Sequence, residues 1–135
     1  MRDIEFRGFN RCTKTWSYAG LKYIIEEQAY NPIEYFKVDP STITQSIGRK
    51  DRNGKDIFEG DIVAIDVPVY DLSISTYPYA VERCFGVIEY DADNLTYKIV
   101  MESVSEYASE FAQQDMEIVG NIFENPELVS WRKEK

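Results

Sequence analysis

The chain has 135 residues, of which 44% are hydrophobic and 14% aromatic, so it is long enough and apolar enough to bury a core of its own. Its formal net charge is −9 and it contains no histidine. The charge argues against a protein that covers bare DNA or RNA with a large basic surface, and the missing histidine excludes catalytic triads that need one and disfavours zinc sites. We expect a single domain over residues 1–135.

Two further features bear on where the protein works. The sequence contains no run of about 18 apolar residues, the length that a membrane-spanning helix needs. The N-terminus alternates charged and apolar residues instead of carrying the apolar core of a signal peptide. Cys12 and Cys84 lie far apart and outside any C-x-x-C motif, which is typical of free thiols in a reducing compartment, although a bridge between them stays open. We therefore expect a cytoplasmic protein without a membrane partner.

The N-terminal part of the chain begins with a predicted hairpin. Ile4–Phe9 alternates apolar and polar residues with a period of two, which predicts a strand, and Thr15–Tyr18 predicts its partner. Residues 21–38 combine one or two helical turns with a strand-like stretch after Asn31-Pro32. The structure of segment 17–42 therefore stays open.

The stretch 45–63 is the most informative one. Its Asn53-Gly54 pair supplies the two positive-φ residues that a type I′ turn requires, so residues 51–56 are predicted to form a hairpin tip. A short strand over 43–47 precedes the tip. A second tight turn precedes a predicted strand over 62–67 that is rich in β-branched residues.

The segment 66–84 has no clean hydrophobic period and contains Pro68 and Pro78. It is predicted to be either a long excursion or a loosely paired hairpin. Beyond it, residues 85–90 and 96–101 predict two strands joined by a polar turn.

The last third of the chain contains the predicted helical structure. Apolar residues at helical spacing, preceded by a Ser-x-x-Glu capping box, predict one short amphipathic helix near 103–114. The members of this stripe are Val104, Tyr107, Ala108, Phe111 and Ala112. Residues 116–123 return to strand, and Asn125-Pro126-Glu127 predicts a C-terminal helical turn.

Short strands separated by regularly spaced turn signals predict the fold class. We expect a mainly β protein, built as a small antiparallel β-barrel or sandwich with SH3-like elements, one short helix and the C-terminal helical turn.

The acidic residues near turns are the first candidates for a metal site. Asp51 and Asp91 each begin a stretch that opens like a calcium loop, but neither stretch has the glycine that the sixth position needs. Asp56, Glu59 and Asp61 could gather around Mg²⁺, but exposed carboxylates beside turns need no ion. We expect no metal, no cofactor and no catalytic residue, and hence a protein that is not an enzyme.

Two groups of residues are candidates for an interaction site. The first is the basic cluster Arg49, Lys50, Arg52 and Lys55, which is either a small nucleic-acid contact or a solvated hairpin tip. The second group consists of Tyr70, Tyr77 and Tyr79, which either form an interface or pack at the edge of the β core.

Four blocks of the sequence, in their order along the chain, resemble the YopX family of bacteriophage and prophage proteins. The blocks are Ile4–Asn10, Ile47–Val63, Gly86–Asp91 and Glu117–Leu128. Segments 17–42 and 66–84 match no motif of the family.

The resemblance implies a small, mostly β protein encoded by phages and mobile elements, without an assigned activity and without catalytic residues to carry over. Together with the residues above, it leads us to expect a phage or prophage accessory protein that acts by binding or self-assembly. A homo-oligomer with an unknown protein partner is the first hypothesis. The alternative is a small nucleic-acid-associated barrel that uses the basic tip at 49–55, which the net charge disfavours.

Overall fold

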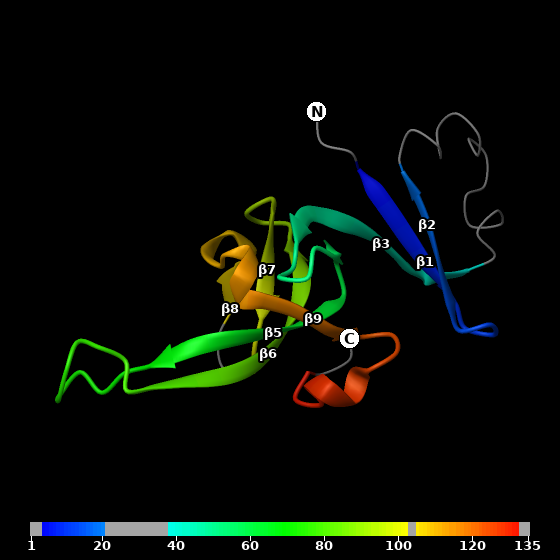
Figure 1. Cartoon of the computed structure of the whole chain (residues 1–135). Helices are drawn as coiled ribbons and strands as arrows, with labels where there is room; N and C mark the ends of the chain where they lie inside the picture. Colours follow the sequence, from blue (N-terminus) through cyan, green and yellow to red (C-terminus); the bar gives the residue numbers. More distant parts are fainter. Residues whose placement is uncertain (1–3, 21–37, 103–104, 133–135) are drawn as a thin grey trace. The chain divides into compact units, whose positions relative to one another are not determined.

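The computed structural model describes residues 4–20, 38–102 and 105–132, and most of these residues lie in antiparallel β-strands (Figure 1). The chain divides into two compact units. The first unit comprises Met1–Arg49 and Asp56–Glu59, and the second comprises Lys50–Lys55 and Gly60–Lys135. The chain therefore passes from one unit to the other three times within residues 45–63. The expectation of a single domain stays a prediction.

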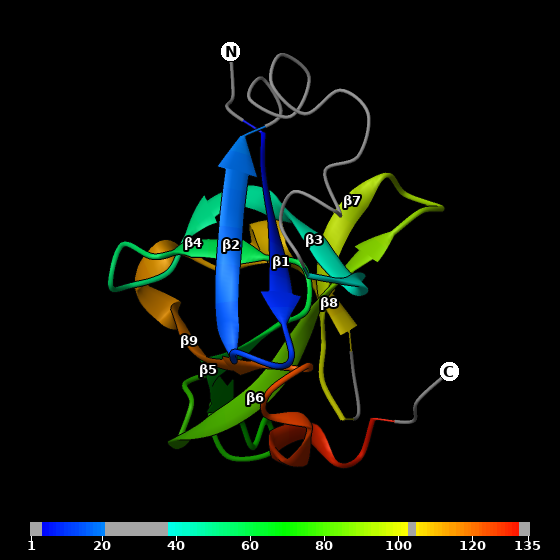
Figure 2. The same cartoon turned by 90° about the vertical axis from the view of Figure 1, so that its right-hand side faces the viewer.

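The first unit contains a four-stranded sheet in the order β2-β1-β3-β4. Its strands are β1 (Glu5–Asn10), β2 (Thr15–Gly20), β3 (Asp39–Lys50) and β4 (Asp56–Phe58). Strands β1 and β2 form the predicted hairpin, which faces the viewer in Figure 2. The guanidinium of Arg7 lies 4.3 Å from the ring centroid of Trp16 and 4.6 Å from that of Phe58. These two aromatic faces stabilise a cation that is almost fully buried.

The second unit contains a five-stranded sheet in the order β8-β7-β6-β5-β9. Its strands are β5 (Asp61–Val69), β6 (Ala80–Asp91), β7 (Thr96–Val100), β8 (Ser105–Tyr107) and β9 (Met116–Asn121). The β-branched run predicted over 62–67 lies in β5, an interior strand of this sheet between β6 and β9, and its apolar side chains from Ile62 to Ile65 are fully buried. Such residues favour a strand that is covered on both faces.

The helical structure near 103–114 differs in kind from the prediction. Instead of one amphipathic α-helix, the described residues form β8 and two 3₁₀ turns, η1 (Ala108–Glu110) and η2 (Gln113–Asp115). Strand β8 pairs with β7, which removes Tyr107 from any helix. A helix of about ten residues is marginal by itself, so the sheet outcompetes it. The predicted C-terminal helical turn is confirmed as η3 (Pro126–Val129), with a proline at its start.

The mainly β, antiparallel fold class is confirmed. Each sheet is open, with β2 and β4 at the edges of one and β8 and β9 at the edges of the other, so neither closes into the barrel that was one of the two alternatives. The hairpin interpretation of segment 66–84 is correct, because β5 and β6 pair in unbroken register from Ile62–Val87 to Val69–Ala80. Residues 21–37, which the sequence left ambiguous, lie outside the described residues.

Candidate interaction surface

A two-stranded arm projects from the sheet of the second unit. Strand β9 pairs only with Asp61–Ile65 of β5, and β7 pairs only with Val87–Asp91 of β6. Among the residues that the structure describes, the next residues of both strands therefore pair only with each other, and they form the green hairpin of Figure 1. We call residues 66–83 the arm.

The end of the arm is ordered by bonds within its own loop. The carboxylate of Asp71 accepts hydrogen bonds from the backbone amide and the hydroxyl of Ser73, and its backbone carbonyl accepts the amides of Ile74 and Ser75. The amide of Tyr79 donates to the carbonyl of Val69 and closes the loop. This tip is a defined structure, although the sequence shows no regular period there.

Large apolar side chains on the arm are exposed to solvent. Six of them are between 49% and 82% exposed, namely Tyr70, Leu72, Ile74, Tyr77, Tyr79 and Val81. The three tyrosines singled out in the sequence thus share one hairpin and do not pack in a core. Sequence reasoning missed the three aliphatic residues. The signal for two of them was the alternation of Leu72 and Ile74 with polar neighbours.

Charged residues cluster at the base of the arm and are nearly absent from its tip. Arg83 lies 2.5 Å from Glu117 and 3.9 Å from Asp66, and Arg52 lies 3.9 Å from Asp66 on its other side. Between Val67 and Val81 the only charged residue is Asp71. The tip is therefore an apolar surface with little charge of its own.

The basic cluster lies around a turn that a buried carboxylate holds in place. Asp51 is fully buried, and its side chain accepts the backbone amides of Asn53 (2.9 Å), Lys55 (3.0 Å) and Ile118 (3.0 Å). The amide of Arg52 donates to the carbonyl of Met116 in β9. Burial alone would raise the pKa of Asp51, but the three amides outweigh it and hold the pKa below its ordinary value.

The turn itself is not of the predicted type I′. Gly54 has φ +80°, but Asn53 is not among the positive-φ residues, and the amide of Gly54 donates to the carbonyl of Asp51. This pattern fits a type I turn followed by a left-handed glycine. The Asp51 carboxylate explains the difference, because an aspartate at the first position bonds to the amides that follow it.

The four cations of the basic cluster are divided between the two units. Arg49 belongs to the first unit, whereas Lys50, Arg52 and Lys55 belong to the second. Arg52 faces Asp66, and Asp51 lies beneath the turn. The nucleic-acid hypothesis stays a prediction, to be tested by salt-sensitive shifts that disappear when Arg49, Lys50 and Arg52 are replaced by Glu.

The comparison with known families agrees with the resemblance seen in the four motif blocks. The sequence model of the YopX protein family matches residues 5–130, nearly the whole chain. The chain belongs to the YopX family. No curated protein matches it. Family membership suggests a phage-associated protein and brings no assigned activity.

The described part of this YopX-family protein offers no cluster for a metal. Within residues 4–20, 38–102 and 105–132, no three Cys, Asp or Glu side chains are grouped so that they could hold an ion. Both cysteines are free thiols. Burial raises the pKa of Cys84, and the neighbouring carboxylate of Glu82 raises it further, which disfavours a reactive thiolate. In the same described residues, no helix is long and apolar enough to cross a membrane.

Proposed function

We propose that this phage-associated protein acts by binding, and that its arm joins copies of the chain into a homo-oligomer in the cytoplasm of the bacterial host. The observation that carries the proposal is the set of six exposed apolar side chains on one hairpin. Monomeric proteins rarely expose apolar patches larger than a few hundred Å².

The exposed area is large enough for a stable interface. If a fully exposed large apolar side chain presents about 200 Å², the exposed fractions of the six residues amount to roughly 800 Å². A standard protein interface buries about 800 Å² on each partner. The arm alone therefore approaches the contact area that a specific dimer needs.

A second copy of the chain is the partner that the arm fits best. An apolar tip with a single charge is complementary to itself, and in a two-fold dimer each contact is made twice. A two-stranded ribbon is also marginally stable by itself, so packing against a second ribbon would stabilise the arm. An anionic lipid surface is a poorer match, because the whole chain carries a net charge of −9.

Binding rather than catalysis is supported by the chemistry of the chain. There is no histidine to act as a general base, and Cys84 is held in its thiol form at neutral pH. The basic turn is held to β9 by a backbone hydrogen bond from Arg52 to Met116 and by the Asp51 carboxylate, which accepts the amide of Ile118; such bonds are typical of a structural element.

Light scattering after size exclusion tests the oligomer. The wild-type protein should have a mass that is a multiple of 15.7 kDa and that falls on dilution. Replacing Leu72, Ile74, Tyr77 and Tyr79 by Ser should leave a folded monomer. Leu95→Ser is the matched control, because Leu95 is 78% exposed but lies in the turn between β6 and β7. A wild-type monomer at high concentration, or an equal loss of mass in the control, would overturn the proposal.

A further inference from the structure

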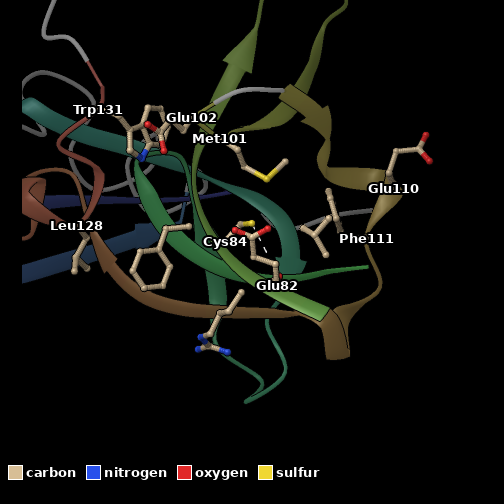
Figure 3. Close-up of a pocket in the computed structure, with 11 residues that line it drawn as sticks. Glu82, Cys84, Met101, Glu102, Glu110, Phe111, Leu128 and Trp131 are labelled. Atoms are coloured by element: carbon tan, nitrogen blue, oxygen red, sulfur yellow. Dashed lines mark hydrogen bonds between the residues drawn. The ribbon is translucent and has the colours of Figure 1, made fainter. Parts of the chain in front are cut away.

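A second surface of the same unit forms a pocket beside β6. The cavity has a volume of about 660 Å³, and its apolar walls come from β5 and β6, from the chain after β7 and η1, and from the C-terminal turn (Figure 3). These wall residues are Val67, Phe85, Met101, Phe111, Leu128 and Trp131. Trp131 and Leu128 also pack against the buried cluster of Ile62, Val87 and Val129, which gives this wall a fixed position.

Within the described residues, one wall of the pocket is a strand edge that has no strand partner. Strand β5 covers one side of β6 from Ala80 to Val87, but β7 covers the other side only from Val87 onward. Among the described residues, no backbone hydrogen bond occupies the outer side of Glu82–Phe85. Unpaired edge groups of this kind can accept an added strand.

The rim of the pocket is negatively charged. Glu82, Glu102 and Glu110 line it, and within the described part of the chain none of these three carboxylates makes an ion pair. The one cation at the pocket, Arg83, is engaged by Asp66 and Glu117. The site thus presents three unneutralised carboxylates around aromatic and aliphatic walls.

We propose that this pocket binds a basic and apolar peptide segment of a partner protein, which adds as a strand to the free edge of β6. An ammonium or guanidinium of the segment pairs with the three glutamates, and neighbouring apolar side chains cover Phe85, Phe111 and Trp131. Strand addition of this type gains affinity from backbone bonds and specificity from alternate side chains. The arm of a second copy does not fit, because its only Lys or Arg is Arg83, which Asp66 and Glu117 already engage.

A labelled peptide tests the proposal directly. The probe is an acetylated hexapeptide of sequence Lys-Phe-Lys-Val-Lys-Leu, measured by fluorescence anisotropy and by the change in tryptophan emission, to which Trp131 in the pocket contributes. It should bind, whereas the same peptide with Glu in place of Lys should not. A probe methylated at alternate backbone nitrogens should bind at least tenfold more weakly, because it cannot donate to the strand edge.

Charge-neutral variants locate the binding site. Each of Glu82→Gln, Glu102→Gln and Glu110→Gln should weaken the Lys peptide by about two- to fivefold, as expected for a partly exposed ion pair. Asp93→Asn is the matched control, because it also removes one negative charge but lies in the turn between β6 and β7. The variant with four Ser substitutions in the arm should keep full peptide affinity, which separates this proposal from self-association.

Several results would overturn the proposal. One is no binding of the Lys peptide; another is an equal loss of affinity in Asp93→Asn, which would indicate attraction to the net charge alone. Unchanged binding of the methylated probe would exclude strand addition. Free phenethylamine that binds while the peptide does not would show that the pocket takes a small amine instead.

Discussion

Two hairpin loops of the second unit, the turn 51–55 and the arm tip 70–79, contrast in how they are held. The turn is polar, and the carboxylate of its first residue, Asp51, is buried and accepts a hydrogen bond from β9. The hydrogen bonds of the arm tip lie within the arm itself, and its apolar side chains face solvent. The polar loop therefore behaves as a structural anchor, and the apolar loop has the properties of an interface.

The contrast teaches that residue type alone does not show which loop is functional. A fully buried aspartate with three amide donors is satisfied inside the fold and is not accessible to a ligand from solvent. Exposed Leu, Ile and Tyr side chains lower their free energy only when another surface covers them. The following variants should separate the two loops by their effect on the free energy of unfolding.

The largest effect is expected for Asp51→Ala. Three backbone amides lose their acceptor, and the amide of Ile118 is in a strand of the sheet, so the free energy of unfolding should fall by about 3 kcal/mol. Urea unfolding monitored by circular dichroism measures this. Asp93→Ala is the control, because the Asp93 carboxylate accepts no hydrogen bond within the described residues, and this variant should have no measurable effect. A loss below about 1 kcal/mol for Asp51→Ala would contradict the anchor role.

Gly54→Ala should have the next largest effect. The φ angle of Gly54 is +80°, and no heavy atom lies within 4 Å of an added Cβ, so only the backbone conformation opposes the substitution. The expected destabilisation is about 1–2 kcal/mol. Asparagine tolerates a left-handed backbone, so Gly54→Asn should lose clearly less. Equal losses in the two variants would mean that conformational strain is not the cause.

The stability contributed by the Asp51 charge should depend on pH. Because the folded pKa lies below the ordinary value, this contribution is present above the ordinary pKa of 3.8 and is lost as the pH falls through the lower folded value. The difference in unfolding free energy between wild type and Asp51→Asn should be constant from pH 7 to pH 5 and shrink below about pH 4. A difference that grows on acidification would contradict this.

Asp39 in the first unit gives an independent check in acid. The side chain of Arg11 hydrogen-bonds to its carboxylate, as do the hydroxyl and amide of Ser41, and together they lower the pKa of Asp39 to about 2. Its contribution should be present above pH 3.8 and be lost as the pH approaches 2. Arg11→Gln should remove most of this dependence, as measured by acid titration of the Asp39 carboxyl by NMR.

The smallest effect on the isolated chain is expected at the arm. Ile74 is 82% exposed, so Ile74→Ser at high dilution should change the free energy of unfolding by less than about 0.5 kcal/mol. At high concentration the wild type should instead show a Tm that rises with concentration, and Ile74→Ser should reduce that rise. A loss of more than about 1 kcal/mol at high dilution would show that Ile74 packs against its own chain.

Most of the fold class was predictable because its signals are local. Alternation over Ile4–Phe9, the β-branched run from Ile62 and the Asn-Pro start of η3 act through the backbone preferences of neighbouring residues. The apolar stripe over 104–112 led to the wrong prediction of an α-helix because its signal is also local. It matches a helix locally, but the residues around Tyr107 pair with β7, a contact that helical spacing does not encode.

The candidate sites were predictable only in part. The three tyrosines were named as candidates because aromatic residues are enriched at interfaces, and the structure shows that they are exposed; their role in an interface stays a prediction. The pocket was not found, because its walls come from several separate segments between Val67 and Trp131. Nothing in the composition of any one segment indicates that the others lie beside it.

The sequence by itself determined that this is a mainly β protein with antiparallel strands and that it belongs to the YopX family, and it left segment 66–84 open between an excursion and a hairpin. Only the tertiary structure decided that the hairpin extends past its neighbours, that among the described residues β6 has β7 as a partner only from Val87 onward, and that Asp51 accepts a hydrogen bond from an amide 67 residues away. The physical reason is the distance along the chain over which each interaction acts. Alternation, turn chemistry and propensity act over a few residues, whereas strand neighbours and buried hydrogen bonds are set by how the whole chain packs.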